Sequence, residues 1–342
     1  MVLKINFKQY LKTYNTKLSK AIYYPKILRL KKKGLSLKSI ENLYDNLIPK
    51  STLYFWYTEK RIPRIFLSFL KAKKKFSKED MQTFAHVIGN IIGDGGITNK
   101  GYTHYCNTEK FLIKKFKNNM ERIFPEEKPC ITNHKNATHL TYSPRVGRII
   151  WCLFGKFSFG KDTKKITIGI ISQPLKWKMK LLTSLYDDDG SAVKLKQGGY
   201  ISLKQKLKGI ILFVQITLAE CNIKSMISYD QGKWLLRISS YKEMLKFKKE
   251  INFSKDYRKR ERLDEILSTI KYPHFITKQK IVDFLKTGPK SFQNITEQFN
   301  LKRGTLHGHL RGWRKDSKED GLIKNGIIIK IKAGKEIFYM LN

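Results

Sequence analysis

Two stretches of the chain share one pattern of apolar and small residues. Residues 87–95 read Val-Ile-Gly-Asn-Ile-Ile-Gly-Asp-Gly, and residues 182–190 read Leu-Thr-Ser-Leu-Tyr-Asp-Asp-Asp-Gly. Each predicts an apolar helix with small or short residues four positions apart on one face, namely Gly89 and Gly93 in the first copy and Ser184 and Asp188 in the second. Because small residues on facing surfaces let two helices approach closely, we expect these helices to pack side by side.

Both stretches end in an Asp-Gly pair. Gly95 and Gly190 suit the left-handed cap with which many helices end. The aspartates are less ordinary, because a carboxylate at a helix C-terminus faces the negative end of the helix dipole and costs about 0.3–1 kcal/mol. Side-by-side packing would bring Asp94 and Asp189 together at one end, where a bound cation would offset that cost.

The paired motifs resemble the LAGLIDADG homing endonucleases, whose motif is a helix of this kind ending in an acidic residue and Gly. The first copy matches in its Gly-x-x-x-Gly-Asp-Gly form, whereas the second places Asp188 where a small residue is usual. One copy alone would be a weak signal. Two copies in one chain make the resemblance strong over roughly residues 80–250.

The pattern around each motif predicts the same order of elements twice. After Asp94 we expect a strand pair ending at residues 102–106, a helix over 109–123, a hairpin turning at Lys135-Asn136 and a helix over 144–154. After Asp189 we expect a strand at 199–203, a helix over 207–220, a hairpin over 224–238 and a helix over 240–250. Each half therefore reads as helix, hairpin, helix, hairpin, helix.

The spacing between the halves favours an internal duplication. Asp94 and Asp189 lie 95 positions apart, Tyr105 and Ile201 lie 96 apart, and the pairs at 142–143 and 238–239 lie again 96 apart. The predicted fold is α+β, with duplicated αββαββα halves at residues 77–173 and 174–271.

The resemblance implies that the two sheets form a pseudo-two-fold saddle on duplex DNA. Either His104 and Cys106 or Thr103 and Tyr105 would face the groove, and the sequence does not settle which.

Both ends of the chain suggest further DNA-binding modules. Residues 1–76 resemble a helix-turn-helix domain whose second helix would enter the major groove; the alternative is a small helical bundle with a solvated basic face. The expected contacts there are Lys50, Ser51, Thr52 and Tyr54. Residues 272–342 read as a winged helix with a reading helix over 302–311. The expected contacts there are Lys302, Arg303, Thr305, His307 and Arg311.

The composition indicates which class of molecule the protein binds. The 342 residues carry a formal net charge of +41 and a pI near 10.0, which favours a polyanion such as nucleic acid. A basic protein at a membrane surface is the alternative, but no apolar run approaches the ~18–20 residues that span a bilayer. The N-terminus lacks the apolar core of a signal peptide. Four scattered cysteines suit reduced thiols, so we expect a cytoplasmic protein.

The sequence does not favour a zinc site. Its ligands would be Cys130, His134, His139 and Cys152, whose spacing lacks the tight pairs of structural zinc sites. His307 and His309 make a poor metal pair because residues two apart point to different sides of a helix. They read better as phosphate or base contacts, or as exposed side chains.

The resemblance also implies the chemistry. In the family the paired acidic residues bind divalent metal near each scissile phosphate, so Asp94 and Asp189 would hold Mg²⁺ or Mn²⁺, helped by the carbonyls of Gly93 and Asp188. A polar or basic residue after each motif would assist, and the candidates are Asn107, Lys204 and Lys194. Asp187 reads as a capping or packing residue. The basic linker at residues 161–165 would meet phosphates.

These observations predict a monomeric, site-specific DNA endonuclease. Two alternatives use the same scaffold, an RNA maturase that assists intron splicing and a regulator that binds DNA without cleaving it. The presence of both Asp94 and Asp189 counts against the regulator.

Overall fold

The computed structural model describes residues 3–14, 16–73, 75–158, 164–195, 198–255, 257–269, 274–299, 301–312, 321–334 and 336–342. They form two compact units, one of residues 1–195 with 199–264 and one of residues 265–342 with 196–198. Part of the predicted linker, residues 161–163, lies outside the described residues. Among the described residues, none of the helices has the length and apolar character needed to cross a bilayer.

The centre of the larger unit is a pair of helices, α6 (Lys78–Ile92) and α10 (Leu175–Asp189). A capping box starts α6: Ser77 Oγ accepts from Asp80 N at 3.0 Å, and Asp80 Oδ2 accepts from Ser77 N at 2.9 Å. A Cβ added at Gly89 would lie 2.9 Å from Ser184 Cβ and would also clash with the Leu181 carbonyl oxygen. The predicted close approach of the two motif helices is confirmed.

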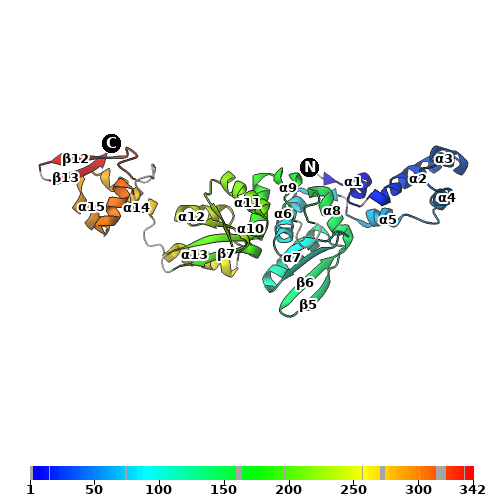
Figure 1. Ribbon diagram of the computed structural model, residues 1–342, viewed down its shortest axis with the longest axis horizontal. Helices are drawn as coiled ribbons and strands as arrows, with labels where there is room; N and C mark the ends of the chain where they lie inside the picture. Colours follow the sequence, from blue (N-terminus) through cyan, green and yellow to red (C-terminus); the bar gives the residue numbers. More distant parts are fainter. Residues whose placement is uncertain are drawn as a thin grey trace. The chain divides into compact units, whose positions relative to one another are not determined.

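Each central helix is followed by four strands and two helices, several of which are labelled in Figure 1. The first half contains β3 (Gly95–Ile97), β4 (Thr103–Asn107), α7 (Lys110–Ile123), β5 (Cys130–His134), β6 (Ala137–Tyr142) and α8 (Pro144–Phe154). The second contains β7 (Gly190–Lys194), β8 (Gly199–Gln205), α11 (Lys208–Glu220), β9 (Met226–Asp230), β10 (Lys233–Ile238) and α12 (Tyr241–Glu250). A short helix, α9 (Ile168–Ile171), precedes α10, and α13 (Arg258–Thr269) follows α12.

The two sheets are antiparallel and have matching strand orders, β3-β4-β6-β5 and β7-β8-β10-β9. Gly95 pairs with Tyr105 in the first sheet, and Gly190 pairs with Leu203 in the second. The structural counterpart of Tyr105 is therefore Leu203, and the predicted match to Ile201 is wrong. The β7–β8 hairpin is three residues longer than the β3–β4 hairpin, which shifts everything on β8.

The amino-terminal part of this unit is helical. It contains β1 (Leu3–Lys4), α1 (Phe7–Leu11), the 3₁₀ helix η1 (Thr16–Tyr23), α2 (Tyr24–Lys32), α3 (Leu37–Leu43), α4 (Lys50–Tyr57), α5 (Arg64–Lys71) and β2 (Lys75–Phe76). Ser36 caps α3, since its Oγ accepts from Ser39 N at 3.2 Å. Leu53 and Trp56 of α4 pack into a small core with Tyr24, Ile27 and Ile40.

The smaller unit has the element order helix, strand, two helices, two strands. These are α14 (His274–Leu285), β11 (Lys290–Ser291), α15 (Phe292–Phe299), α16 (Arg303–Arg311), β12 (Ile328–Ala333) and β13 (Glu336–Leu341). The sheet order is β11-β13-β12, and its core includes Ile281, Leu306, Leu310 and Tyr339. The winged-helix domain expected over residues 272–342 and its role in DNA binding stay predictions.

Candidate active site

Two carboxylates lie at the same end of the central helix pair. Asp189 is the last residue of α10, and Asp94 follows Gly93, the C-cap of α6. Burial raises the pKa of Asp189 to about 6, and the negative charge of Asp94 contributes to the rise. The Asp94 side chain is exposed, yet the protein atoms crowded around it displace enough water to raise its pKa as well. The structure therefore brings together the two aspartates predicted from the motifs.

A side-chain amide on the adjacent sheet holds each carboxylate. Asn107 Nδ2 donates to Asp94 Oδ2 at 2.8 Å, and Gln205 Nε2 donates to Asp189 Oδ2 at 2.5 Å. Asn107 ends β4 and Gln205 ends β8, so they are structural counterparts. Asn107, an expected auxiliary residue, thus lies against Asp94, and its role in catalysis stays a prediction.

The structure places Gln205, and not Lys204, at Asp189. The ammonium group of Lys204 lies 3.2 Å from Asp230 Oδ2 on β9, which is two strands away in the same sheet. The prediction named the residue next to Gln205, and adjacent residues of a strand point to opposite faces of the sheet. Lys194 is exposed at the far end of β7, opposite Gly199, and its auxiliary role stays a prediction.

Two lysines donate hydrogen bonds to backbone carbonyls at the C-terminal ends of the central helices. Lys164 Nζ donates to the carbonyl oxygens of Ile92 and Gly93 at 2.9 and 2.6 Å. Lys259 Nζ donates to those of Asp187 and Asp188 at 2.5 and 3.1 Å. The carbonyls at a helix end lack partners within the helix, and a cation there also meets the negative end of the dipole.

Sequence reasoning placed Lys164 only in a phosphate-contacting linker and missed Lys259. The signal was available, because the two lysines are 95 positions apart, like Asp94 and Asp189. Their charges oppose the rise in pKa of both carboxylates, and burial in turn lowers the pKa of Lys259. The carbonyls of Gly93 and Asp188, which the resemblance assigned to metal, accept these lysine hydrogen bonds instead.

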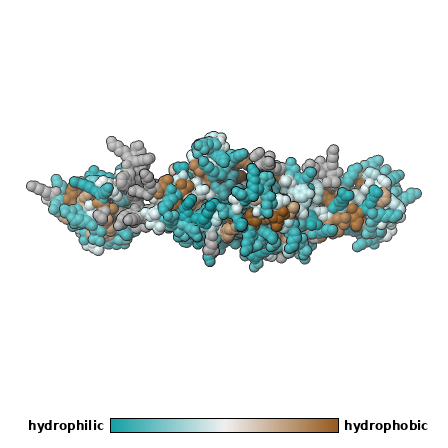
Figure 2. Space-filling model, turned by 90° about the horizontal axis from the view of Figure 1, so that it is seen from below, coloured by the Kyte–Doolittle hydropathy of each residue, from teal (hydrophilic) through white to brown (hydrophobic). Residues whose placement is uncertain are grey.

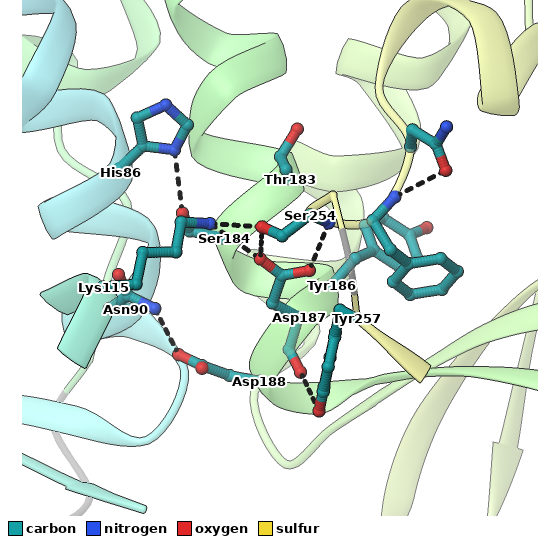
Figure 3. A network of polar contacts seen from close by, with 12 residues as sticks. His86, Asn90, Lys115, Thr183, Ser184, Tyr186, Asp187, Asp188, Ser254 and Tyr257 are labelled. Atoms are coloured by element: carbon teal, nitrogen blue, oxygen red, sulfur yellow. Dashed lines mark hydrogen bonds and ion pairs between the residues drawn. The ribbon is translucent and has the colours of Figure 1, made fainter. Parts of the chain in front are cut away.

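A third carboxylate, Asp188, reaches across from α10 to the first half. Its Oδ2 accepts from Asn90 Nδ2 at 3.0 Å, as Figure 3 shows, and its Oδ1 accepts from the Tyr105 hydroxyl at 2.7 Å. Burial, followed by the charge of Asp94, raises the pKa of Asp188 well above its usual range. Burial and the Asp188 charge likewise raise the pKa of Tyr105, so its hydroxyl stays protonated and donates.

Asp187 points away from this cluster and ties the two halves together (Figure 3). The residue is fully buried and accepts from Ser254 N at 2.9 Å, from Ser254 Oγ and from Lys115 Nζ at 2.9 Å. Lys115 lies on α7 and is half-buried, so an ion pair with the buried Asp187 carboxylate joins the halves. A second link is the hydrogen bond of 3.0 Å between His86 Nδ1 and Ser184 Oγ. The packing role expected for Asp187 agrees with these contacts.

The donor set suits a hard divalent cation. Asp94 and Asp189 come from different helices, and the charge of Asp94 raises the pKa of Asp189, a repulsion that a cation would relieve. Mg²⁺ is commonly bound through one or two carboxylates plus substrate phosphates and water. Within the described ranges no cluster of three or more His, Cys, Asp or Glu side chains could hold a metal alone. Asp94 and Asp189 are thus the residues that fit Mg²⁺ or Mn²⁺ with a phosphate as co-ligand.

The two faces of the first sheet differ in burial at β4. Thr103 and Tyr105 are fully buried, whereas His104 and Cys106 are half-buried on the other face, so this second pair is the one that is accessible. Cys106 Sγ lies 3.1 Å from His139 Nε2 across the β4–β6 pair.

The predicted contacts of the terminal regions are mostly accessible. Lys50, Ser51 and Tyr54 of α4 are exposed, and Thr52 is half-buried. In the smaller unit Lys302, Arg303 and Arg311 are exposed, Thr305 is half-buried, and the half-buried His307 packs its ring 4.9 Å from that of Phe292. His309 is only 1% exposed, so the expectation that it contacts phosphate or solvent is wrong. Figure 2 shows a largely hydrophilic surface on the face in view.

Part of the chain is similar to known proteins. Residues 176–252 match a family model described as "LAGLIDADG-like domain". No curated protein matches the chain. Among solved structures, variants of the homing endonuclease I-DmoI are 20% identical, with a TM-score of 0.42, over 52% of this chain and 94% of theirs.

Two further structures are similar. I-DmoI in complex with DNA and Mn is 19% identical, with a TM-score of 0.41, over 50% of this chain and 97% of that one. The N-terminal LAGLIDADG domain of DUF199/WhiA is 13% identical, with a TM-score of 0.38, over 52% of this chain and 85% of that one. At such identities and scores, nothing about the chemistry of this chain follows from these likenesses.

Proposed function

We propose that this protein is a monomeric, divalent-metal-dependent endonuclease that cleaves duplex DNA at a specific site. One observation carries the proposal: two carboxylates meet at the paired helix ends, each with its own amide and its own lysine. A site duplicated in this way suits a substrate with two antiparallel strands. The net charge of +41 suits a polyanionic substrate.

The residues divide the work as follows. Asp94 and Asp189 hold the metal, and Asn107 and Gln205 fix the orientation of the carboxylates through one oxygen of each. Lys164 and Lys259 stabilise the ionised carboxylates and place positive charge where a phosphate would enter. When bound, Mg²⁺ or Mn²⁺ would supply an activated water, charge relief at phosphorus and stabilisation of the leaving 3′ oxygen.

The terminal regions extend the proposed DNA contact. The exposed residues of α4 would contact bases in the major groove beside the cleavage site. The exposed residues of α16, in the smaller unit, would contact the major groove at another point of the duplex. They would add affinity and length of footprint without supplying chemistry.

The proposal is tested by selecting cleaved duplexes from a random DNA library with Mg²⁺, with EDTA as the control. We expect a discrete set of duplexes cut on both strands, and only with Mg²⁺. Duplexes that are bound but never cut would make the protein a non-cleaving regulator. Absence of DNA cleavage together with assisted splicing of an intron RNA would make it a maturase.

A further inference from the structure

The duplicated site is unequal at two positions. Gly93 of the first half corresponds to Asp188 of the second, 95 positions later, and Tyr105 corresponds to Leu203 through the strand register. The first half therefore has a tyrosine hydroxyl where the second half has only hydrocarbon. The second motif has a carboxylate where the first has no side chain.

These residues form one chain of hydrogen bonds that ends at Asp94. Asp188 Oδ1 accepts from the Tyr105 hydroxyl at 2.7 Å, and that hydroxyl oxygen accepts from Asn107 Nδ2 at 3.2 Å. The same Asn107 amide donates to Asp94 Oδ2 at 2.8 Å. The orientation of the amide is fixed, because Asn107 Oδ1 accepts from Glu109 N at 2.9 Å and both amide hydrogens are used.

The surroundings hold this chain in place. The Tyr105 ring is fully buried and stacks on Phe116, with ring centroids 4.5 Å apart. Asp188 lies over Gly93, where an added Cβ would come within 2.7 Å of both Asp188 Cβ and Asp188 Oδ2. The missing side chain at Gly93 is thus what makes room for the carboxylate that Tyr105 needs as an acceptor.

We propose that Asp188 and Tyr105 are positioning residues that orient Asn107 and the Asp94 carboxylate, and that Asp189 has no such support. In the second half Gln205 contacts Asp189, but Leu203 offers no group to fix the Gln205 amide. The two strands of a substrate are then cut at rates that depend on different residues. This inference rests on the proposed function.

The test compares Tyr105→Phe with Tyr142→Phe in the full-length protein. Both tyrosines are fully buried in the same sheet, but no hydrogen-bond partner is present for the Tyr142 hydroxyl among the described residues. Each strand of a selected duplex carries its own label, so the two cleavage rates are measured separately. Binding of Mn²⁺ to the free protein is followed by electron paramagnetic resonance.

We expect Tyr105→Phe to change the ratio of the two strand rates about 3- to 10-fold, the rate effect of losing one ordinary hydrogen bond. Mn²⁺ binding should weaken by a similar factor, and Tyr142→Phe should change neither quantity. Equal slowing of both strands, or no change, overturns the proposal, because a loosened core would act on both strands alike.

Variants at Asp188 supply the conservative rescue. Asp188→Ala should behave like Tyr105→Phe. Asp188→Asn keeps an acceptor for Tyr105, and the Asn90 amide can turn its oxygen, which has no partner among the described residues, toward the new NH₂ group. Asp188→Asn should therefore keep the wild-type strand ratio, and a ratio like that of Asp188→Ala would contradict the proposal.

Failure of the proposed function is separable from failure of this inference. A wild-type protein that cleaves no duplex refutes the nuclease, and the Mn²⁺ isotherms then decide the positioning role. Weaker binding in Tyr105→Phe than in Tyr142→Phe supports it. Identical isotherms, or a wild-type protein that binds no Mn²⁺, overturn it.

Discussion

The two halves of the larger unit repeat their polar groups by type but differ in the residues packed between them. Each half contributes one aspartate, one amide and one lysine, namely Asp94, Asn107 and Lys164 in the first and Asp189, Gln205 and Lys259 in the second. The packing positions differ, with Gly93 facing Asp188 and with Tyr105 replaced by Leu203. The halves thus share a set of polar groups and differ in how firmly each group is held.

The largest effect should come from the point where the halves touch. Gly89→Ala would place a Cβ 2.9 Å from Ser184 Cβ and against the Leu181 carbonyl, so the helices must separate. Overpacking of this kind costs roughly 3 kcal/mol of stability. The control is Gly209→Ala on α11, where an added Cβ meets nothing within 4 Å. Urea unfolding should show a large loss for the first variant and none for the second; equal stabilities would refute close backbone packing.

The paired lysines come next. Lys164→Met and Lys259→Met should each slow cleavage by about 100-fold, the usual result of removing one preorganised charge from a catalytic site. Lys204→Met is the matched control, since its ammonium pairs with Asp230. Strand-resolved rates on a selected duplex provide the measurement. A loss for only one of the two lysines would mean that the halves are not functional copies.

The raised pKa of Asp189 predicts a smaller effect on stability in metal-free protein. Its folded pKa of about 6 exceeds the unfolded value of roughly 3.9, so the folded state binds more protons between these values. Its ionisation therefore destabilises the fold as pH rises through 6. Asp189→Asn should gain about 1–2 kcal/mol over wild type at pH 7 and little at pH 4. Unfolding in EDTA at both pH values checks this; a gain independent of pH would exclude the titration.

The smallest effect should be on DNA binding by the smaller unit. Changing Lys302, Arg303 and Arg311 together to Ala should flatten the log–log salt dependence of DNA binding by roughly 2–3, because each phosphate contact contributes a slope near −0.9. Lys286→Ala serves as the control, since its ammonium lies 2.8 Å from Asp283. An unchanged slope in the triple variant would make α16 a packing element.

Local patterns predicted the elements well. The apolar runs, the Ser77 and Ser36 caps and the Pro144 start of α8 are readable from neighbouring residues, and Asp94 and Asp189 followed from the repeat. The equivalence across β8 failed, because three additional residues in one hairpin leave no local mark on the apolar pattern. The same error hid Gln205 as the counterpart of Asn107.

The long-range contacts could not be predicted from local patterns. Lys259 reaches the end of α10 from about 70 positions away, and Asp188 reaches Tyr105 from 83 positions away. A motif comparison marks Asp188 only as a departure from a small residue. The Asp188 side chain can reach Tyr105 only because Gly93 has no side chain, and this contact is visible only once the two helices are packed together.

The central claim is that Asp94 and Asp189 together make one duplicated catalytic site. The direct measurement is double-strand cleavage and binding of a selected duplex by Asp94→Asn, Asp189→Asn and the double variant, with Mg²⁺. We predict that each single variant loses double-strand cleavage while its affinity stays within roughly tenfold of wild type, since most affinity comes from phosphate contacts elsewhere. A double variant that still cuts both strands would contradict the claim.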